Sequence, residues 1–220
     1  RRLDGVRLTA AGFTNITQDH LDYHADFEAY FAAKAGLFDR VLPEDGVAVI
    51  NIDDARGPAM AEIAVDRGQD LLTVGRAPGA HLRIEGQRFD ATGQDLRFTW
   101  NGAPHQVRME LIGGFQAENA LVAAGLVIAS GCDPAQVFRA LARLSGVRGR
   151  MQLAARRGNG AAVFVDYAHT PDALRTALAA YRAHDDVGGQ SSCLGNLGQA
   201  LLDAGTALAA AAADENNEAN

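Results

Sequence analysis

Apolar runs alternate with helix-like segments in the first third of the chain, and this alternation limits the possible folds more than any other feature. Residues 12–17, 46–51 and 70–74 are short runs of the kind found in strands. Residues 26–40 and 59–67 lie between them and have the apolar spacing of helices. Strands that alternate with helices in this way form parallel sheets. The sequence therefore predicts an α/β domain with a parallel sheet.

The pattern changes at residues 81–109, where apolar and polar residues alternate across turns that contain Gly and Asn. This stretch predicts a small antiparallel β subsheet. Two helices follow at residues 115–130 and 134–144, joined at Gly131, and residues 163–165 predict a buried strand.

We place a domain boundary near residue 150. Residues 1–150 are expected to form one domain, and residues 151–184 the start of a second, Rossmann-like domain. Residues 185–220 contain Gly, Ser, Ala and Asn with weak periodicity, and we expect this tail to be frame-shifted or disordered, above all in its last ten residues.

Charge and composition exclude several classes of protein. The net charge is −7, but residues 185–220 contain six acidic and no basic residues, so the rest of the chain is nearly neutral. Such a chain lacks the basic field of a nucleic-acid-binding protein. Its longest apolar run, at residues 207–213, is shorter than the roughly 18 residues of a membrane helix. Cys132 and Cys193 have no metal-site spacing. We expect a soluble, cytoplasmic protein.

The segment DHLDYH at residues 19–24 follows the first predicted strand, at the end where open α/β sheets bind ligands. It offers His20 and three neighbours that could bind a metal or move protons, although capping of the next helix is an equal explanation. Lys34 lies in that helix and is the only lysine beside 19 arginines. A lysine amine can add carbon dioxide to form a carbamate whose oxygens suit Mg²⁺, whereas arginine stays protonated. A chance survival of one lysine is the alternative.

Three later segments also contain groups that could take part in chemistry. GGFQAEN at residues 113–119 opens a helix, GVRGRM at residues 146–151 is a basic turn, and DYAHTPDAL at residues 166–174 joins a strand to a helix. Each can also be explained by the residues that ordinarily begin or end a helix or strand. Taken singly, none of them predicts a function.

Taken in order, these segments resemble the Mur ligase family, and in particular its MurE type. The resemblance covers about residues 1–182, and its matching text is FTNITQDHLDYH, AAKAGLF, VINIDD, the GGFxxxN helix start, GVRGRM and VDYAHTPDAL. Six motifs in the family's order make the match specific. It implies the family's central ATP-binding domain, without its phosphate-binding part, followed by the beginning of the C-terminal domain.

The resemblance also implies roles for particular residues. Lys34, as a carbamate, and His20 would be catalytic and would bind Mg²⁺. Arg2 would bind the UDP-muramoyl substrate. The residues that match adenine- and ribose-binding positions are Asn119, Arg150, Asp166 and His169.

The implied reaction belongs to peptidoglycan biosynthesis. It adds a third amino acid, meso-diaminopimelate or L-lysine, to UDP-MurNAc-L-Ala-D-Glu. ATP phosphorylates the D-glutamate side-chain carboxylate, and the incoming amine displaces phosphate from the acyl phosphate, while Mg²⁺ offsets the charge on the phosphates. The implied partners are these small molecules, with no nucleic acid or membrane, and the implied state is a monomer.

The sequence also departs from the family pattern. The phosphate-binding loop G-T-N-G-K-T should precede Arg1, and residues 185–220 lack the expected glycine-rich segment G-C-G-G-x-R-D. Gly114 and Gln116 replace the usual Arg and Asn of the helix start. We therefore expect an internal fragment that cannot catalyse ligation alone.

Three other functions remain open from the sequence. One is a ligase of the folylpolyglutamate synthetase type, which shares the superfamily. Another is a metal-dependent hydrolase that uses His20, Asp22, His24 and a carbamylated Lys34 to activate water. The third is a noncatalytic remnant or binding module.

Overall fold

The computed structural model describes residues 5–16, 26–90, 92–146, 152–156, 158 and 162–165. The chain divides into two compact units, Arg1–Ser145 and Gly146–Asn220.

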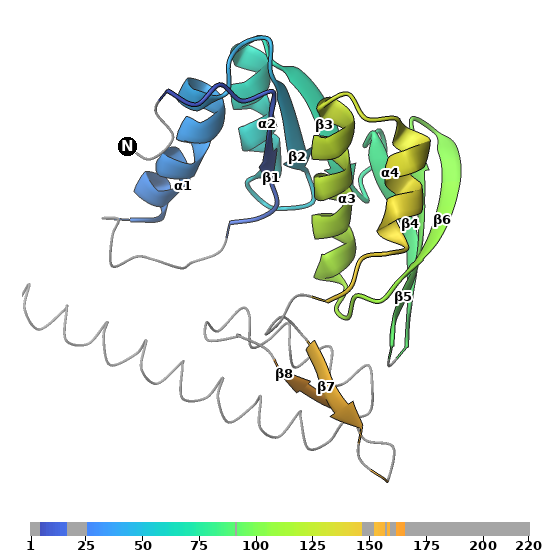
Figure 1. The fold of residues 1–220 in the computed structure, drawn as a ribbon. Helices are drawn as coiled ribbons and strands as arrows, with labels where there is room; N and C mark the ends of the chain where they lie inside the picture. The colour runs from blue at the N-terminus through green and yellow to red at the C-terminus, as the bar shows by residue number, and fades with distance from the viewer. Residues whose placement is uncertain are drawn as a thin grey trace, which may run out of the picture. The chain divides into compact units, whose positions relative to one another are not determined.

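The first unit is built on a parallel sheet, as the sequence predicts. Strands β1 (Ala10–Phe13), β2 (Val47–Asn51) and β3 (Asp70–Gly75) are parallel neighbours in that order. β1 begins at Ala10, before the predicted run, and its pairing with β2 ends at Phe13, where the polar residues of the predicted turn begin. The carboxyl ends of the three strands lie at one edge, drawn at the bottom of the sheet in Figure 1.

The antiparallel part continues the same sheet and does not form a separate one. Strands β4 (Leu82–Asp90), β5 (Gly93–Trp100) and β6 (Ala103–Met109) are antiparallel neighbours. The start of β4 pairs in parallel with the end of β3, which joins the two parts into a six-stranded sheet of order β1-β2-β3-β4-β5-β6. Asn101 and Gly102, with φ of 47° and 83°, form the tight turn between β5 and β6.

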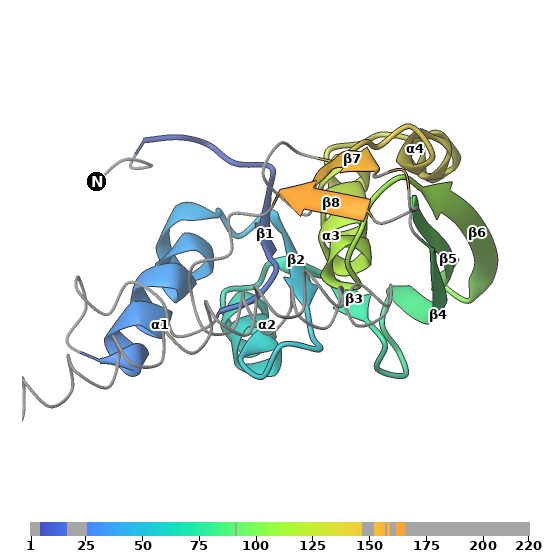
Figure 2. The same cartoon turned by 90° about the horizontal axis from the view of Figure 1, so that it is seen from below.

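Helices cover both faces of the sheet. α1 (Phe27–Gly36) and α2 (Gly57–Asp66) lie on one face, and α3 (Phe115–Ala129) and α4 (Pro134–Leu141) lie on the other (Figures 1 and 2). The helix predicted over residues 26–40 is present, but its last turns form a π-helix, η2 (Leu37–Val41). Figure 2 shows the resulting three layers from the side of the strands' carboxyl ends.

β2 shows how the sequence supplies both faces. Ala48 and Ile50 pack with the core beneath α1 and α2, while Val49 packs with the core beneath α3 and α4. All three side chains are fully buried, as expected for a central parallel strand. Burying an aliphatic side chain as large as Val49 or Ile50 contributes roughly 1.5–3 kcal/mol. The two cores together therefore hold both helical layers on the sheet.

Side-chain caps define where two helices begin. The Asp26 carboxylate accepts from the Ala29 N–H at 2.7 Å, and the Asp133 carboxylate accepts from the Gln136 N–H at 3.0 Å. Both caps satisfy N–H groups that have no partner inside the helix. These starts agree with the helices predicted at residues 26 and 134.

The second unit contains a two-stranded antiparallel hairpin in its described part. β7 (Gln152–Arg156) pairs with β8 (Ala162–Val165). Val165 is 49% exposed, so this strand is not buried along its whole length as its apolar sequence predicts. Among the described residues of both units, no helix is long and apolar enough to cross a membrane.

Candidate functional site

Two of the seven predicted site residues, Lys34 and Asn119, lie in the described part of the chain. Lys34 is on α1 and Asn119 is on α3, so they stand on helices that cover opposite faces of the sheet. The other five predicted residues lie outside the described residues: Arg2, His20, Arg150, Asp166 and His169.

Polar side chains tie together the loops at the carboxyl edge of the parallel strands. The Asn51 amide donates to the Thr14 carbonyl at 2.8 Å, which links the end of β2 to the segment after β1. The Asn51 side-chain oxygen accepts from the Asp53 N–H at 3.1 Å. Asn51 is buried, and these two bonds satisfy both ends of its amide.

Two adjacent carboxylates extend this network in opposite directions. Asp53 accepts from the Arg76 N–H at 2.7 and 2.9 Å, and so binds the loop after β3. Asp54 accepts from the Ile16 N–H at 3.2 Å and from the Arg56 N–H at 2.8 Å. Gly75 makes room for Asp53, because a Cβ at this position would lie 2.5 Å from Oδ1. The loops after three strands are thus fixed to one another by hydrogen bonds.

The first turn of α3 lies close to the same edge. Glu118 is half-buried, and burial raises the pKa of its carboxyl, while Arg76 opposes this effect and Asp53 adds to it. Asn119 follows and is exposed. Asn119, which is predicted to contact the nucleotide, therefore lies next to Glu118, whose pKa is affected by charges in the loops after β2 and β3.

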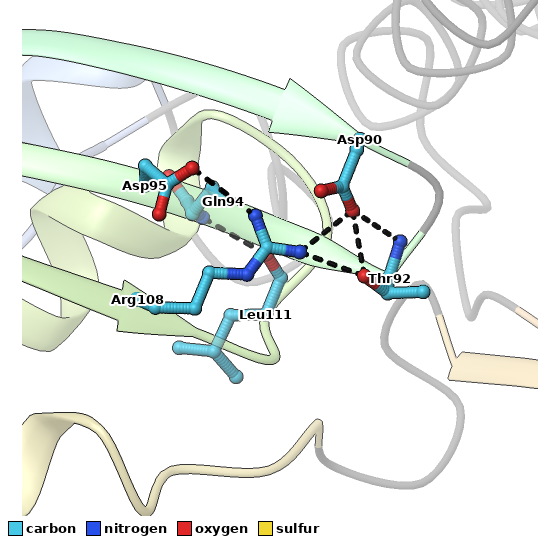
Figure 3. Close-up of polar contacts among 6 residues, drawn as sticks. All are labelled: Asp90, Thr92, Gln94, Asp95, Arg108 and Leu111. Carbon is cyan, nitrogen blue, oxygen red and sulfur yellow. Dashed lines mark hydrogen bonds and ion pairs between the residues drawn. The ribbon is translucent and has the colours of Figure 1, made fainter.

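Two glutamines hold the turn that leads into α3. The buried Gln94 amide donates to the carbonyls of Leu111 at 3.0 Å and Gly113 at 3.2 Å. Gln87 donates to the Gln94 oxygen at 2.9 Å and to the Gly114 carbonyl at 2.9 Å. Its own oxygen accepts from the Arg76 guanidinium. This chain of amides connects the start of α3 with the loop after β3, and Figure 3 shows its Gln94–Leu111 link.

An ion-pair cluster stiffens the far end of the β4–β5 hairpin (Figure 3). The Arg108 guanidinium donates to Asp90 at 2.7 Å and Thr92 at 2.7 Å, and it lies 3.4 Å from Asp95. The Arg108 hydrogen bond, helped by those from Thr92, holds the pKa of the Asp90 carboxyl well below its usual range. These groups are largely exposed, so water and salt weaken the pairing. None of the predicted site residues belongs to this cluster.

Lys34 lies in the last turn of α1 with its side chain exposed. Its Nζ is 5.3 Å from the centroid of the Tyr30 ring. Among the residues that the structure describes, no group of three or more His, Cys, Asp or Glu side chains could hold a metal ion. The described residues thus include one of the two predicted magnesium ligands, Lys34, with its side chain exposed.

Two surface hollows lie elsewhere in the first unit. Their volumes are about 420 and 490 Å³, and both are lined by Phe98, His105 and Gln106 of β5 and β6, the larger one also by α4. Neither is lined by Lys34, Asn119 or the loops after β1 to β3.

Two family models match consecutive parts of the chain. The Mur ligase middle domain matches residues 1–127, and the Mur ligase glutamate ligase domain matches residues 149–218. The chain belongs to the Mur ligase family. The second match includes most of residues 185–220, the tail that the sequence analysis left outside the resemblance, whereas alignments with curated family members cover 84% of the chain or slightly less.

Individual family members resemble the chain in sequence and in fold. A UDP-N-acetylmuramoyl-L-alanyl-D-glutamate–2,6-diaminopimelate ligase of Caulobacter vibrioides is 50% identical over 184 residues, which are 84% of this chain and 38% of that protein. A solved structure of a ligase with this name has a TM-score of 0.69 at 33% identity and covers 83% of this chain and 37% of its own. The chain thus spans well under half the length of these Mur ligases.

The fold is shared more widely. Mycobacterium tuberculosis folylpolyglutamate synthase, solved with ADP, has a TM-score of 0.63 at 24% identity over 79% of this chain and 38% of its own. At this identity the likeness extends to the fold alone.

Several residues at the carboxyl edge have no role predicted from the sequence. Asp53 and Asp54 stand directly after a predicted strand, and that position could have marked them as edge residues. Arg56 and Arg76 are two of 19 arginines and had no such signal. Their partners are distant in sequence, so local patterns could not have found them.

Proposed function

We propose that this chain is part of a MurE-type ligase that joins meso-diaminopimelate to UDP-MurNAc-L-Ala-D-Glu in peptidoglycan synthesis. The observation that carries the proposal is the 50% identity to the Caulobacter diaminopimelate ligase over 84% of the chain. The middle-domain match also includes both Lys34 and Asn119. We propose diaminopimelate and not L-lysine as the amino acid, because the names of the Caulobacter protein and of the solved structure at 33% identity both include diaminopimelate.

The proposed cofactors are ATP and Mg²⁺. Lys34, as a carbamate, and His20 would hold Mg²⁺, which would offset charge on the phosphates. Asn119, Arg150, Asp166 and His169 would bind the adenine and ribose of ATP, and Arg2 would bind the UDP-muramoyl substrate. The exposed side chains of Lys34 and Asn119 are both accessible to ligands, which supports these roles.

The loops at the carboxyl edge would give this site its shape. Asp53 and Asp54 use their oxygens to bind backbone N–H groups of neighbouring loops, so they act on the architecture and not on the substrate. A network of this kind keeps binding groups in position before the substrate arrives. Phosphoryl transfer and attack by the amine both depend on such positioning.

Ligation by the full-length protein that contains this chain tests the proposal. With ATP, Mg²⁺, UDP-MurNAc-L-Ala-D-Glu and diaminopimelate, we expect UDP-tripeptide, and much less product when L-lysine replaces diaminopimelate. Lys34→Arg keeps the positive charge but cannot form a carbamate. It is expected to lower kcat by at least about 100-fold, the loss seen when a preorganised charge-stabilising group is removed.

Arg7→Lys is the matched control, since Arg7 is exposed and forms only a surface ion pair with Asp45. It should leave kcat unchanged. Wild-type activity in Lys34→Arg would disprove the role of Lys34. Glutamate addition to a folate, without UDP-tripeptide formation, would favour the folylpolyglutamate synthase alternative instead.

A further inference from the structure

The turn at residues 54–56, after β2, contacts both described flanks of the segment 17–25. On one side the Asp54 carboxylate accepts from the N–H of Ile16, the last described residue before that segment. On the other side the Arg56 side chain reaches the first turn of α1, which begins at Phe27. The same carboxylate accepts from the Arg56 N–H, so the two contacts share one rigid turn.

Arg56 contacts α1 in three ways. Its guanidinium carbon is 5.2 Å from the centroid of the Phe27 ring and 5.2 Å from that of the Phe31 ring. It also forms an ion pair and hydrogen bond with Glu28. The two rings lie one helical turn apart, so a single planar cation is in contact with both of them and with the carboxylate near them.

The backbone of the turn is held by a hydrogen bond within the turn and by close packing against the end of β2. The Gly57 N–H donates to the Asp54 carbonyl at 2.8 Å. A Cβ on Gly57 would lie 2.2 Å from the Asn51 carbonyl oxygen, so α2 begins in direct contact with the end of β2. Arg56 therefore extends from a fixed point of the sheet.

Little of α1 is fully buried, although Phe27 and Phe31 are partly buried against the core. Only Tyr30 and Ala35 of its ten residues are buried. Lys34 lies on the same helix, next to Tyr30, whose ring in turn makes an edge contact with Phe27 at 6.5 Å. A shift of the first turn of α1 would therefore be passed on to Lys34.

We propose that Arg56, held by Asp54, is a positioning residue that sets where α1 presents Lys34 relative to the carboxyl edge of the sheet. This inference rests on the proposed role of Lys34 in the ligase. Its physical basis is the planar guanidinium, which can pair with Glu28 while it covers two aromatic rings; an ammonium group cannot make the same set of contacts.

The test compares Arg56→Met and Arg56→Lys with the parent in the full-length protein that contains this chain. Arg56→Met keeps the length of the side chain but loses the ion pair and the cation. We expect amide hydrogen exchange in α1 to become about tenfold faster, with α3 unchanged. We also expect the Mg²⁺ concentration for half-maximal activity to rise roughly tenfold, as for residues that orient metal ligands, with KM for ATP within about twofold of the parent.

The carbamate on Lys34 can be measured by carbon-13 NMR in labelled bicarbonate, and its amount should decrease in Arg56→Met. In hydrogen exchange, Mg²⁺ dependence and carbamate content, Arg56→Lys should lie between the parent and Arg56→Met. Arg7→Met removes an equally charged but exposed pair and should match the parent.

Unchanged exchange in α1 would overturn the positioning role. Faster exchange with unchanged Mg²⁺ dependence and carbamate would overturn the connection to Lys34. If Lys34→Arg stays active, the proposed function of Lys34 fails, and the exchange rates of α1 still decide whether Arg56 holds the helix.

Discussion

Gln94 is a single side chain that determines the path of the backbone before α3. It is fully buried and donates to two carbonyls of the turn at residues 111–113, while its oxygen accepts from Gln87. A buried amide with all these partners is stable, but its removal leaves polar groups without partners in the core. Gln94 thus fixes the approach to the helix that contains Asn119.

Gln94→Leu should lower the free energy of unfolding by about 1–3 kcal/mol, because the Leu111 and Gly113 carbonyls lose a donor and stay buried. Urea unfolding at 25 °C measures the change. Gln106→Leu is the control, since Gln106 is exposed on β6, and it should change stability by less than about 0.5 kcal/mol. Equal effects of the two substitutions would mean that the amide network contributes nothing.

Glu118 provides a pH-dependent test at the same scale. Burial raises the pKa of its carboxyl, so the charged form is less favourable in the folded chain than in the unfolded chain. Glu118→Gln should therefore stabilise the chain at pH 7, by less than about 1 kcal/mol because the group is only half-buried.

The gain should disappear as the pH falls below the ordinary value of 4.5, where the carboxyl is protonated in both states. Unfolding in urea at pH 7 and pH 4 measures it. Glu62→Gln, at an exposed position of α2, is the control variant. A Glu118→Gln protein that is less stable than the parent at pH 7 would contradict the effect of burial.

At the scale of elements, α3 packs close to the sheet because each side of the contact has a glycine. These are Gly125 on α3 and Gly12 on β1. A Cβ on Gly125 of α3 would lie 2.7 Å from a methyl carbon of Val49, and a Cβ on Gly12 of β1 would lie 3.0 Å from Leu126. Real side chains do not pack at the first of these distances. The absence of a side chain at Gly125 thus sets the spacing between helix and sheet.

Gly125→Ala should lower stability by up to about 2 kcal/mol. The better helix propensity of alanine contributes about 1 kcal/mol, but overpacking against the buried Val49 costs about 1–3 kcal/mol. Gly36→Ala is the matched control at the end of α1, where φ is −56° and no atom lies within 4 Å of the new Cβ. It should raise stability by about 0.5–1 kcal/mol. Thermal unfolding should show opposite signs, and a stabilising Gly125→Ala would contradict the close packing.

At the scale of the whole molecule, the central feature is a sheet with helices on both faces and its polar residues at one edge. Lys34 is in the layer on one face and Asn119 in the layer on the other. Asp53 and Asp54 lie in the loop after β2; Asp53 binds the Arg76 N–H in the loop after β3, and Asp54 binds the Ile16 N–H in the segment after β1. A site built at this edge can use groups from both layers, as open α/β sheets do.

The sequence predicted the order and type of the elements well. The parallel core, the antiparallel strands, and the helices at residues 26, 115 and 134 agree with the structure, because apolar periodicity and capping residues are local signals. The motifs also predicted the family, which the comparisons confirm. The positions of Lys34 and Asn119 on helices followed from the same patterns, while their roles stay predictions.

The tertiary structure alone decided how the elements join. The continuation of β3 into β4 rests on two residue pairs, and the bonds of Asp54 to Ile16 and of Arg56 to Glu28 join residues 38 and 28 positions apart. Such contacts depend on which faces two distant segments present to each other after folding. Local periodicity contains no information on contacts between distant segments. The sequence therefore determined the elements and the family, whereas the tertiary structure determined the hydrogen-bond network that positions the elements.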